Sequence, residues 1–227
     1  DSSLGKVIGQ LWFKRKLPDF FVKFLNLSLV ICADHGPAVS GAHNAIVAAR
    51  AGKDVVSSLC SGLLTIGPRF GGAIDGACKH WYDAVSNVSA DEFVINMKAK
   101  GEKIPGIGHR VKSKSNPDVR VDLLKKFASE LDSSKYLDYA LEVEKLTLLK
   151  NEKLILNVDG CLAAVFLDCL ESADFSQAEI EEILKIGYMN GLFALSRSVG
   201  IIGHVYDQKR LKEGLYRHDT KDILYLK

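Results

Sequence analysis

The sequence predicts an all-α protein built as one compact unit. Apolar residues recur at helical spacing through most of the 227 residues, whereas β-branched alternation bounded by hairpin turns is nearly absent. With five prolines, no Ser/Gly tract and no fixed-period repeat, the chain offers no linker between separate domains. We expect helices near residues 2–13, 19–33, 38–51, 54–66, 71–86, 90–100, 117–131, 135–149, 158–171, 177–201 and 203–213.

Composition excludes several classes of protein. Lys plus Arg exceeds Asp plus Glu by only 30 to 28, which argues against a general nucleic-acid or membrane binder. The five cysteines are odd in number and form no Cys-x-x-Cys pair, so neither a disulfide framework nor a zinc site is expected. The longest apolar run, 154–170, contains Asn157, Asp159 and Asp168 and predicts a core helix. Without a recognisable secretory signal, we expect a cytoplasmic protein.

The segment 103–120 combines glycines, a histidine and cations. Gly106 and Gly108 permit positive φ or close approach to a ligand, and His109 follows with a side chain that exchanges a proton near neutrality. Three further cations follow within five residues, at positions 110, 112 and 114. This combination suits a polyanion, although a Gly-Pro loop with a solvated basic face remains an alternative.

The end of this segment predicts the start of a helix. Asn116 has the preferred chemistry of an N-cap, Pro117 suits the first helical position, and Asp118 would lie in the first turn. Arg120 would then lie near free N–H groups at a helix N-terminus, which also favour an anion.

A second junction occurs at Asp-His-Gly-Pro. An apolar helix ends there, and Pro37 predicts the start of a new helix rich in Gly, Ala and Ser, whose small side chains permit close helix contact. His35 would lie beside the new helix N–H groups, a position suited to binding a carboxylate. His43 has no partner at the spacing of a zinc pair, so we interpret it as a hydrogen-bonded core histidine.

Asp159 lies in strongly apolar surroundings. Burial raises the pKa of a carboxyl group, while nearby cations or N–H donors lower it, so Asp159 is either a tuned acid/base or a locked structural partner. An ordinary N-cap role for a helix beginning near Gly160 is a further alternative.

Arg197 occupies a helical pattern typical of a buried element. An interior guanidinium needs an anionic partner, which a ligand carboxylate, Asp159 or Asp207 could supply. His204 follows on the same pattern, and we assign it to the core. Arg217, near the C-terminus, has no local partner in the pattern.

Five ordered motifs together resemble a known family. Their combination is similar to the citrate-synthase-like, citryl-CoA lyase part of ATP-citrate lyase, and the resemblance covers essentially the whole chain. The motifs are Asp-His-Gly-Pro with Gly-Ala-His-Asn at 34–44, Gly-Ile-Gly-His-Arg at 106–110 with Asn-Pro-Asp-Val-Arg at 116–120, Asn-Val-Asp-Gly at 157–160, Ser-Arg-Ser-Val-Gly-Ile-Ile-Gly-His at 196–204 and Gly-Leu-Tyr-Arg-His at 214–218.

The resemblance implies a fold and an activity. The expected fold is that of citrate synthase, with residues 1–227 forming one lyase module and a small helical lid subdomain at about 90–200. The module would form a homodimer or tetramer and split citryl-CoA into acetyl-CoA and oxaloacetate, and it would work beside the citrate- and ATP-activating part of ATP-citrate lyase. Alternatives are citrate synthase in the condensing direction, or mainly an oligomerisation core.

The resemblance also implies residue roles. His35 would bind the oxaloacetate portion, His109 would act at its carbonyl or hydroxyl oxygen, and Asp159 would serve the acetyl carbon. Cleavage needs a base to remove the hydroxyl proton, a role that suits His109, and an acid for the enolate, a role that suits Asp159. Arg120, Arg197 and Arg217 match carboxylate-binding arginines, with Arg217 reaching into the partner subunit's site.

Coenzyme A contacts are expected on the same loop. The matching positions are Lys103, Ile104, Gly106, Ile107 and Gly108, with Lys112 and Lys153 as phosphate contacts. No metal or redox cofactor is expected.

One departure distinguishes the chain from citrate synthases. Those enzymes carry a histidine in a Gly-Pro-Leu-His-Gly type motif, but the matching region 64–72 has none. The difference predicts a lyase rather than an efficient synthase. A backbone N–H, Ser40 or water would then have to stabilise the enolate.

Overall fold

The computed structural model describes residues 3–67, 72–222 and 225. Within these residues the chain forms eleven α-helices and one short 3-10 helix, with no β-strand, so the predicted all-α class is confirmed. The helices are α1 (Leu4–Leu11), α2 (Asp19–Ile31), α3 (Ser40–Arg50), α4 (Val55–Leu63), α5 (Ala73–Val85), α6 (Ala90–Ala99), α7 (Val119–Ala128), α8 (Lys135–Leu148), α9 (Val158–Ser172), α10 (Gln177–Ile186), α11 (Tyr188–Leu211) and η1 (Thr220–Asp222).

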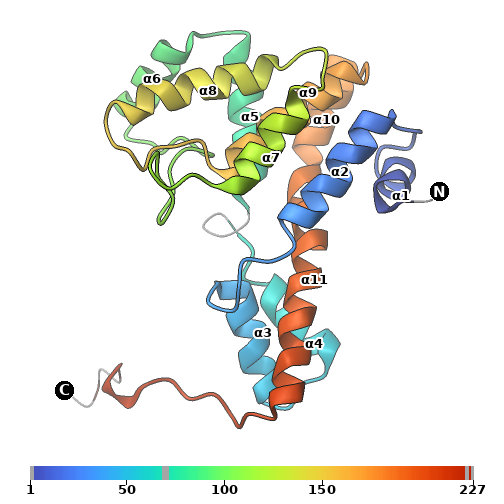
Figure 1. Ribbon diagram of the computed structural model, residues 1–227, viewed down its shortest axis with the longest axis vertical. Helices are drawn as coiled ribbons and strands as arrows, with labels where there is room; N and C mark the ends of the chain where they lie inside the picture. Colours follow the sequence, from blue (N-terminus) through green and yellow to red (C-terminus); the bar gives the residue numbers. More distant parts are fainter. Residues whose placement is uncertain (1–2, 68–71, 223–224, 226–227) are drawn as a thin grey trace.

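The long helix α11 connects two regions of the molecule. In Figure 1 its first half lies in the larger helical body and its second half lies beside α3 and α4. Accordingly, α11 contacts α2 and α5 in the body and both α3 and α4 below it. After α11 the chain first contacts α3, where Arg50 Nε donates to the Gly214 carbonyl at 2.7 Å, and then leads away from the helices toward the C-terminus (Figure 1).

Helix α9 is the centre of the larger core. Every residue from Gly160 to Leu170 is buried, which explains why its sequence shows apolar residues on all sides. It packs against α2, α5, α7 and α8. Between α3, α4 and α11 lies a smaller apolar cluster of Ala45, Ile201 and Val205. There, a Cβ on Gly62 would lie 2.7 Å from the carbonyl oxygen of Gly41, so the predicted close contact between small residues is present.

The predicted helices 177–201 and 203–213 are wrong. The break occurs at Gly187, whose φ of 88° ends α10, and α11 then continues without interruption past Gly203. Gly203 has helical neighbours on both sides, and a single glycine within a helical pattern is only a weak indication that the helix ends.

A contact from α5 explains the true position of the break. The buried carboxylate of Asp75 accepts hydrogen bonds from the N–H groups of Met189 and Asn190, both at 3.2 Å, and so caps α11 from outside the helix. A Cβ on Gly187 would lie 2.8 Å from Asp75 Oδ2, so glycine allows the carboxylate to approach.

Two other helix starts differ from expectation. Helix α3 begins at Ser40, because Pro37 to Val39 form a turn rather than the first helical residues. Within the apolar run 154–170 only the part from Val158 is helical. Across the described part of the chain, no helix is both long and apolar enough to cross a membrane.

Candidate active site

Five of the six predicted catalytic and carboxylate-binding residues meet at one cavity. The cavity has a volume of about 220 Å³. Its lining residues are Cys32, His35, Val39, His109, Arg120, Asn157, Val158, Asp159, Phe193 and Arg197. They come from the segment after α2, the loop before α7, the start of α9 and the middle of α11. The sixth residue, Arg217, is exposed on the C-terminal segment and does not line the cavity.

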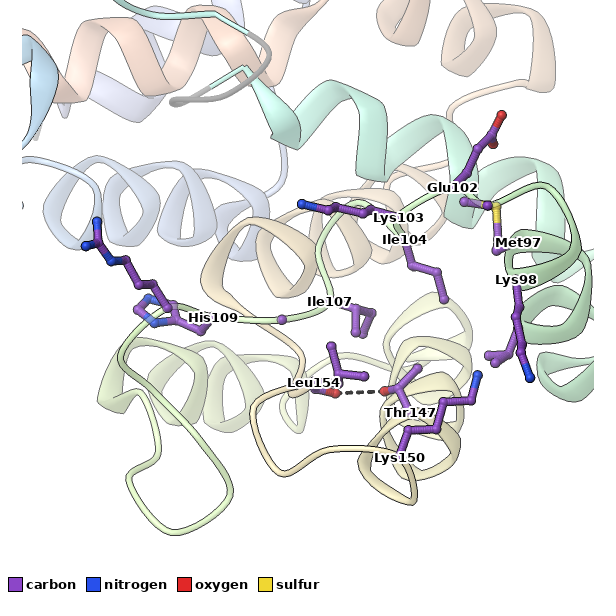
Figure 2. A pocket seen from close by; sticks show the side chains of 14 residues that line it. Met97, Lys98, Glu102, Lys103, Ile104, Ile107, His109, Thr147, Lys150 and Leu154 are labelled. Carbon is purple, nitrogen blue, oxygen red and sulfur yellow. Dashed lines mark hydrogen bonds between the residues drawn. The ribbon is translucent and has the colours of Figure 1, made fainter.

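A larger cavity of about 640 Å³ adjoins this site (Figure 2). Of the predicted coenzyme A contacts, Lys103, Ile104, Ile107 and Gly108 line it, whereas Gly106, Lys112 and Lys153 do not. Its charged lining consists of Lys98, Lys103, Arg110 and Lys150 against Glu102, a positive excess that suits a phosphate-bearing ligand. His109 lines both cavities, so a ligand filling the larger one would end at the smaller one.

Main-chain hydrogen bonds pair the loop before α7 with the segment before α9. Gly108 N–H donates to the carbonyl of Ile155 at 2.7 Å, and His109 N–H donates to that of Lys153 at 3.0 Å. Thr147 of α8 holds the second segment in turn, because its hydroxyl donates to the Leu154 carbonyl at 2.7 Å (Figure 2). Through its carbonyl, Lys153 therefore supports His109, and the phosphate role of its side chain stays a prediction.

Gly106 is required by packing as well as by backbone conformation. Its φ is 87°, and an added Cβ would lie 2.5 Å from the Cα of Gly160. The loop and the first turn of α9 thus touch backbone to backbone, immediately after Asp159. A structural role accounts for this glycine without a ligand.

His109 is oriented by its own loop. Its Nδ1 accepts hydrogen bonds from the N–H groups of Val111 at 3.0 Å and Lys112 at 2.8 Å. A ring nitrogen that accepts two hydrogen bonds carries no proton, so the neutral imidazole is protonated at Nε2. Burial lowers the pKa of His109, and the positive charges of Arg120 and Lys112 lower it further against the opposing effect of Asp118. The predicted base therefore presents a hydrogen-bond donor instead of a lone pair at Nε2.

Asp118, not Asn116, caps α7. Its Oδ1 accepts a hydrogen bond from Arg120 N–H at 3.0 Å, and the helix begins at Val119. The carboxylate also binds the Arg120 side chain at two points, with Nε–Oδ1 at 3.0 Å and Nη2–Oδ2 at 2.6 Å. Burial raises the pKa of Asp118, but the hydrogen bonds and charge of Arg120 outweigh it and lower the pKa overall. Arg120, which is predicted to bind a substrate carboxylate, is thus already paired with the carboxylate of Asp118.

Asp159 lies in the first turn of α9, and Asn157 caps that helix by accepting from Gly160 N–H at 3.0 Å. The alternative that Asp159 is the N-cap is therefore wrong. Burial raises the pKa of Asp159, the charge of Asp118 adds to this effect, and Arg120 and Arg197 oppose it. A half-buried carboxyl with a raised pKa facing two guanidinium groups is suited to accept and return a proton.

Arg197, near the middle of α11, is 4 % exposed. Its Nε donates to the Cys32 carbonyl at 2.9 Å, and its guanidinium lies 4.6 Å from the centre of the Phe193 ring. Asp207 pairs instead with Arg210 at 2.9 Å, so it is not the anion that the sequence left open for Arg197. The guanidinium, held through Cys32 and Phe193, lines the small cavity beside Asp159.

Of three further histidines, one lines the small cavity and two make contacts outside it. His35 is exposed at the small cavity, and burial, then the charges of Arg120 and Arg197, lower its pKa. His204 binds Asp34 with Nε2–Oδ1 at 2.9 Å, a contact that anchors the residue before His35 to α11. His43 is half-buried against the Tyr216 ring, with centroids 5.2 Å apart, rather than enclosed in a core.

Sequence reasoning missed half of the lining of the small cavity. Cys32, Val39, Val158 and Phe193 carry no chemical signal that separates them from core residues. Asn157 had a usable signal, since asparagine two residues before a first-turn aspartate is typical of an N-cap. Ser40 does not line the cavity, and positions 68–71 of the histidine-free region lie outside the described residues.

Known proteins resemble this chain over nearly its whole length. The family model of the citrate synthase C-terminal domain matches residues 1–219. ATP-citrate synthase beta chain protein 1 of Arabidopsis thaliana is 59 % identical over 227 residues, covering 99 % of this chain but 37 % of that protein. The chain thus spans little more than a third of that relative's length.

Two solved structures are similar over nearly the whole chain. ATP citrate lyase from Methanothrix soehngenii, in complex with citrate and coenzyme A, superposes with a TM-score of 0.96 at 57 % identity, over 98 % of this chain and 37 % of that one. Citryl-CoA lyase from Hydrogenobacter thermophilus gives a TM-score of 0.81 at 25 % identity, over 99 % of this chain and 83 % of that one. The resemblance seen in the five motifs is confirmed, and the chain belongs to the citrate synthase family, with its high-identity relatives among the ATP-citrate synthases.

Proposed function

We propose that this chain cleaves citryl-CoA to acetyl-CoA and oxaloacetate. The observation that carries the proposal is that His109 lies on both cavities. The larger, basic cavity suits coenzyme A, and the smaller one offers Arg120 and Arg197 to the carboxylates of the citryl group. Relatives of high identity include an ATP citrate lyase solved with citrate and coenzyme A.

Cleavage moves one proton from oxygen to carbon. The tertiary hydroxyl of citryl-CoA loses its proton, the carbon–carbon bond breaks to give the ketone of oxaloacetate, and the thioester enolate takes a proton to become acetyl-CoA. His109 keeps its proton and donates a hydrogen bond from Nε2–H to the tertiary oxygen, because its Nδ1 is occupied by two N–H groups. Asp159, as a carboxylate of raised pKa, accepts the hydroxyl proton and returns it to the acetyl carbon.

The direct test is incubation of the purified chain with citryl-CoA while oxaloacetate is followed through malate dehydrogenase and NADH. Time-dependent, enzyme-proportional oxaloacetate is expected. Absence of oxaloacetate above the spontaneous rate, from a chain that melts cooperatively, would contradict the proposal.

Citrate synthase activity is the second candidate, since the fold itself is shared with synthases. Thiol release from acetyl-CoA and oxaloacetate would reveal it. The absence of the synthase histidine from region 64–72 predicts a rate far below that of citryl-CoA cleavage. A pure oligomerisation role predicts neither reaction and no loss of activity in a longer parent protein when His109 is replaced by alanine.

We also propose that the chain works in the cytoplasm as a homodimer or tetramer, alongside a citrate- and ATP-activating part. Arg217 supports a shared site, because it is exposed and does not line the cavity of its own subunit. In the proposed assembly Arg217 binds a substrate carboxylate in the partner subunit's site.

A further inference from the structure

Asn157 stands where the loop of the larger cavity meets the helix that carries Asp159. Its side-chain Oδ1 accepts from the N–H of Gly160 at 3.0 Å, and its Nδ2 donates to the carbonyl of Gly108 at 2.9 Å. Its own backbone N–H donates to the carbonyl of Gly106 at 2.9 Å. One residue therefore joins the backbone on both sides of the site.

The two ends of the amide act on different parts of the proposed reaction. Gly108 precedes His109 and lines the larger cavity, whereas Gly160 follows Asp159 on α9. A carboxamide supplies an acceptor and a donor in one rigid plane, so it can satisfy a helix N–H and a loop carbonyl together. Asparagine, aspartate and serine are nearly equal as N-caps, so capping alone does not require the amide.

We propose that Asn157 is a positioning residue that couples the coenzyme A loop, residues 103–109, to the catalytic carboxylate of Asp159. Ligand in the larger cavity orders Gly108, and the amide transmits this order to the first turn of α9. The backbone contact between Gly106 and Gly160 is a second connection between the loop and α9, and together with the Asn157 amide it forms what we call the joint. The proposal rests on the proposed citryl-CoA cleavage for its catalytic consequence, but the coupling itself exists without substrate.

Two substitutions separate coupling from capping. Asn157→Ser keeps an N-cap oxygen but cannot reach Gly108, and Asn157→Asp keeps the cap while turning a donor into an oxygen that repels the Gly108 carbonyl. Ser176→Ala is the control, because Ser176 caps α10 through Glu179 N–H and lines neither cavity. Wild type and the three variants are compared by hydrogen exchange of the 103–112 peptide, by coenzyme A affinity from calorimetry and by the rate of oxaloacetate release.

Both Asn157 variants are expected to exchange the 103–112 amides at least about 10-fold faster than wild type, with Asp the faster of the two. Misplacement of reacting groups predicts a loss of kcat of roughly 10- to 100-fold, with weaker coenzyme A binding. The control should lower the melting temperature and leave all three readouts unchanged.

Exchange of 103–112 at the wild-type rate in both Asn157 variants would overturn the inference and leave Asn157 as a plain cap, as would faster exchange with unchanged kcat. If wild type itself releases no oxaloacetate, the proposed function fails, while the exchange measurement still decides whether the joint exists.

Discussion

The Asp118 carboxylate accepts two hydrogen bonds from the Arg120 guanidinium, with Nε–Oδ1 at 3.0 Å and Nη2–Oδ2 at 2.6 Å, beside the cavity that Asp159 lines. Asp118 is 6 % exposed, so its carboxylate is shielded from water, whereas the Arg120 side chain is partly exposed. The pair places the positive charge of Arg120 at the small cavity and the negative charge of Asp118 next to it. Both charges influence the protonation of Asp159.

Replacing Asp118 by asparagine should shift the acid limb of the pH–rate profile to lower pH. The carboxylate of Asp118 raises the pKa of Asp159, and its loss also leaves the charge of Arg120 uncompensated, which lowers that pKa further. Asparagine retains the capping oxygen for α7. The measurement is kcat/KM for citryl-CoA cleavage against pH, and a limb that stays in place or moves upward would contradict this account.

Asp159→Asn should reduce cleavage by about 10²- to 10⁴-fold, the usual contribution of a positioned acid/base group. The same change should stabilise the fold at pH 7. Because the folded-state pKa is raised above the ordinary 3.8, wild type loses stability as pH rises from that value through the folded pKa, whereas the variant has no such group.

Urea unfolding at several pH values checks the stability part of this prediction. The difference in the free energy of unfolding should favour the variant at pH 7 and become insensitive to pH once both states of wild type are protonated at Asp159. An Asn variant that is less stable at pH 7 would show that Arg120 and Arg197 outweigh burial.

Gly106→Ala should destabilise the chain much more than Gly52→Ala. Both glycines have positive φ, 87° and 85°, but nothing lies within 4 Å of a Cβ on Gly52, whereas one on Gly106 meets the Gly160 backbone at 2.5 Å. The matched control should lose about 1–2 kcal/mol from backbone strain alone. Thermal melts of the two variants measure the difference, and equal losses would mean that the loop shifts freely away from α9.

His109 should be found neutral and protonated at Nε2 near pH 7. Its Nδ1 accepts from Val111 and Lys112 N–H, and burial lowers the pKa of the ring. Nitrogen-15 NMR of the labelled ring distinguishes the two tautomers. Removal of this donor in His109→Ala should cost about 10²- to 10³-fold in kcat. A Nδ1–H tautomer would return His109 to the role of base.

Arg217→Ala should reduce cleavage without changing the melting temperature, because Arg217 is exposed and does not line the cavity of its own subunit. In a dimer with shared sites, mixing this variant with Asp159→Asn should restore about a quarter of wild-type activity, since half of the dimers regain one intact site. No recovery after subunit exchange, confirmed by mass spectrometry, would place Arg217 outside the partner's site.

Much of this protein follows from the sequence alone. The all-α class and most helix positions depend on apolar periodicity and local caps, which neighbouring residues determine. The resemblance of five motifs to the citrate synthase family also singled out His35, His109, Arg120, Asp159 and Arg197, all of which line one cavity. Periodicity, caps and motifs each depend on residues that are close in sequence, so they can be recognised without the tertiary structure.

Contacts between distant segments decided the rest. Asp75 of α5 caps α11 and so places the helix break at Gly187, and Asn157 joins the start of α9 to a loop 49 residues away. The ring nitrogen that His109 presents depends on two N–H groups whose direction only the folded loop determines. Tertiary packing brings such partners within hydrogen-bond distance, and residue identity alone does not say which donor will meet which acceptor.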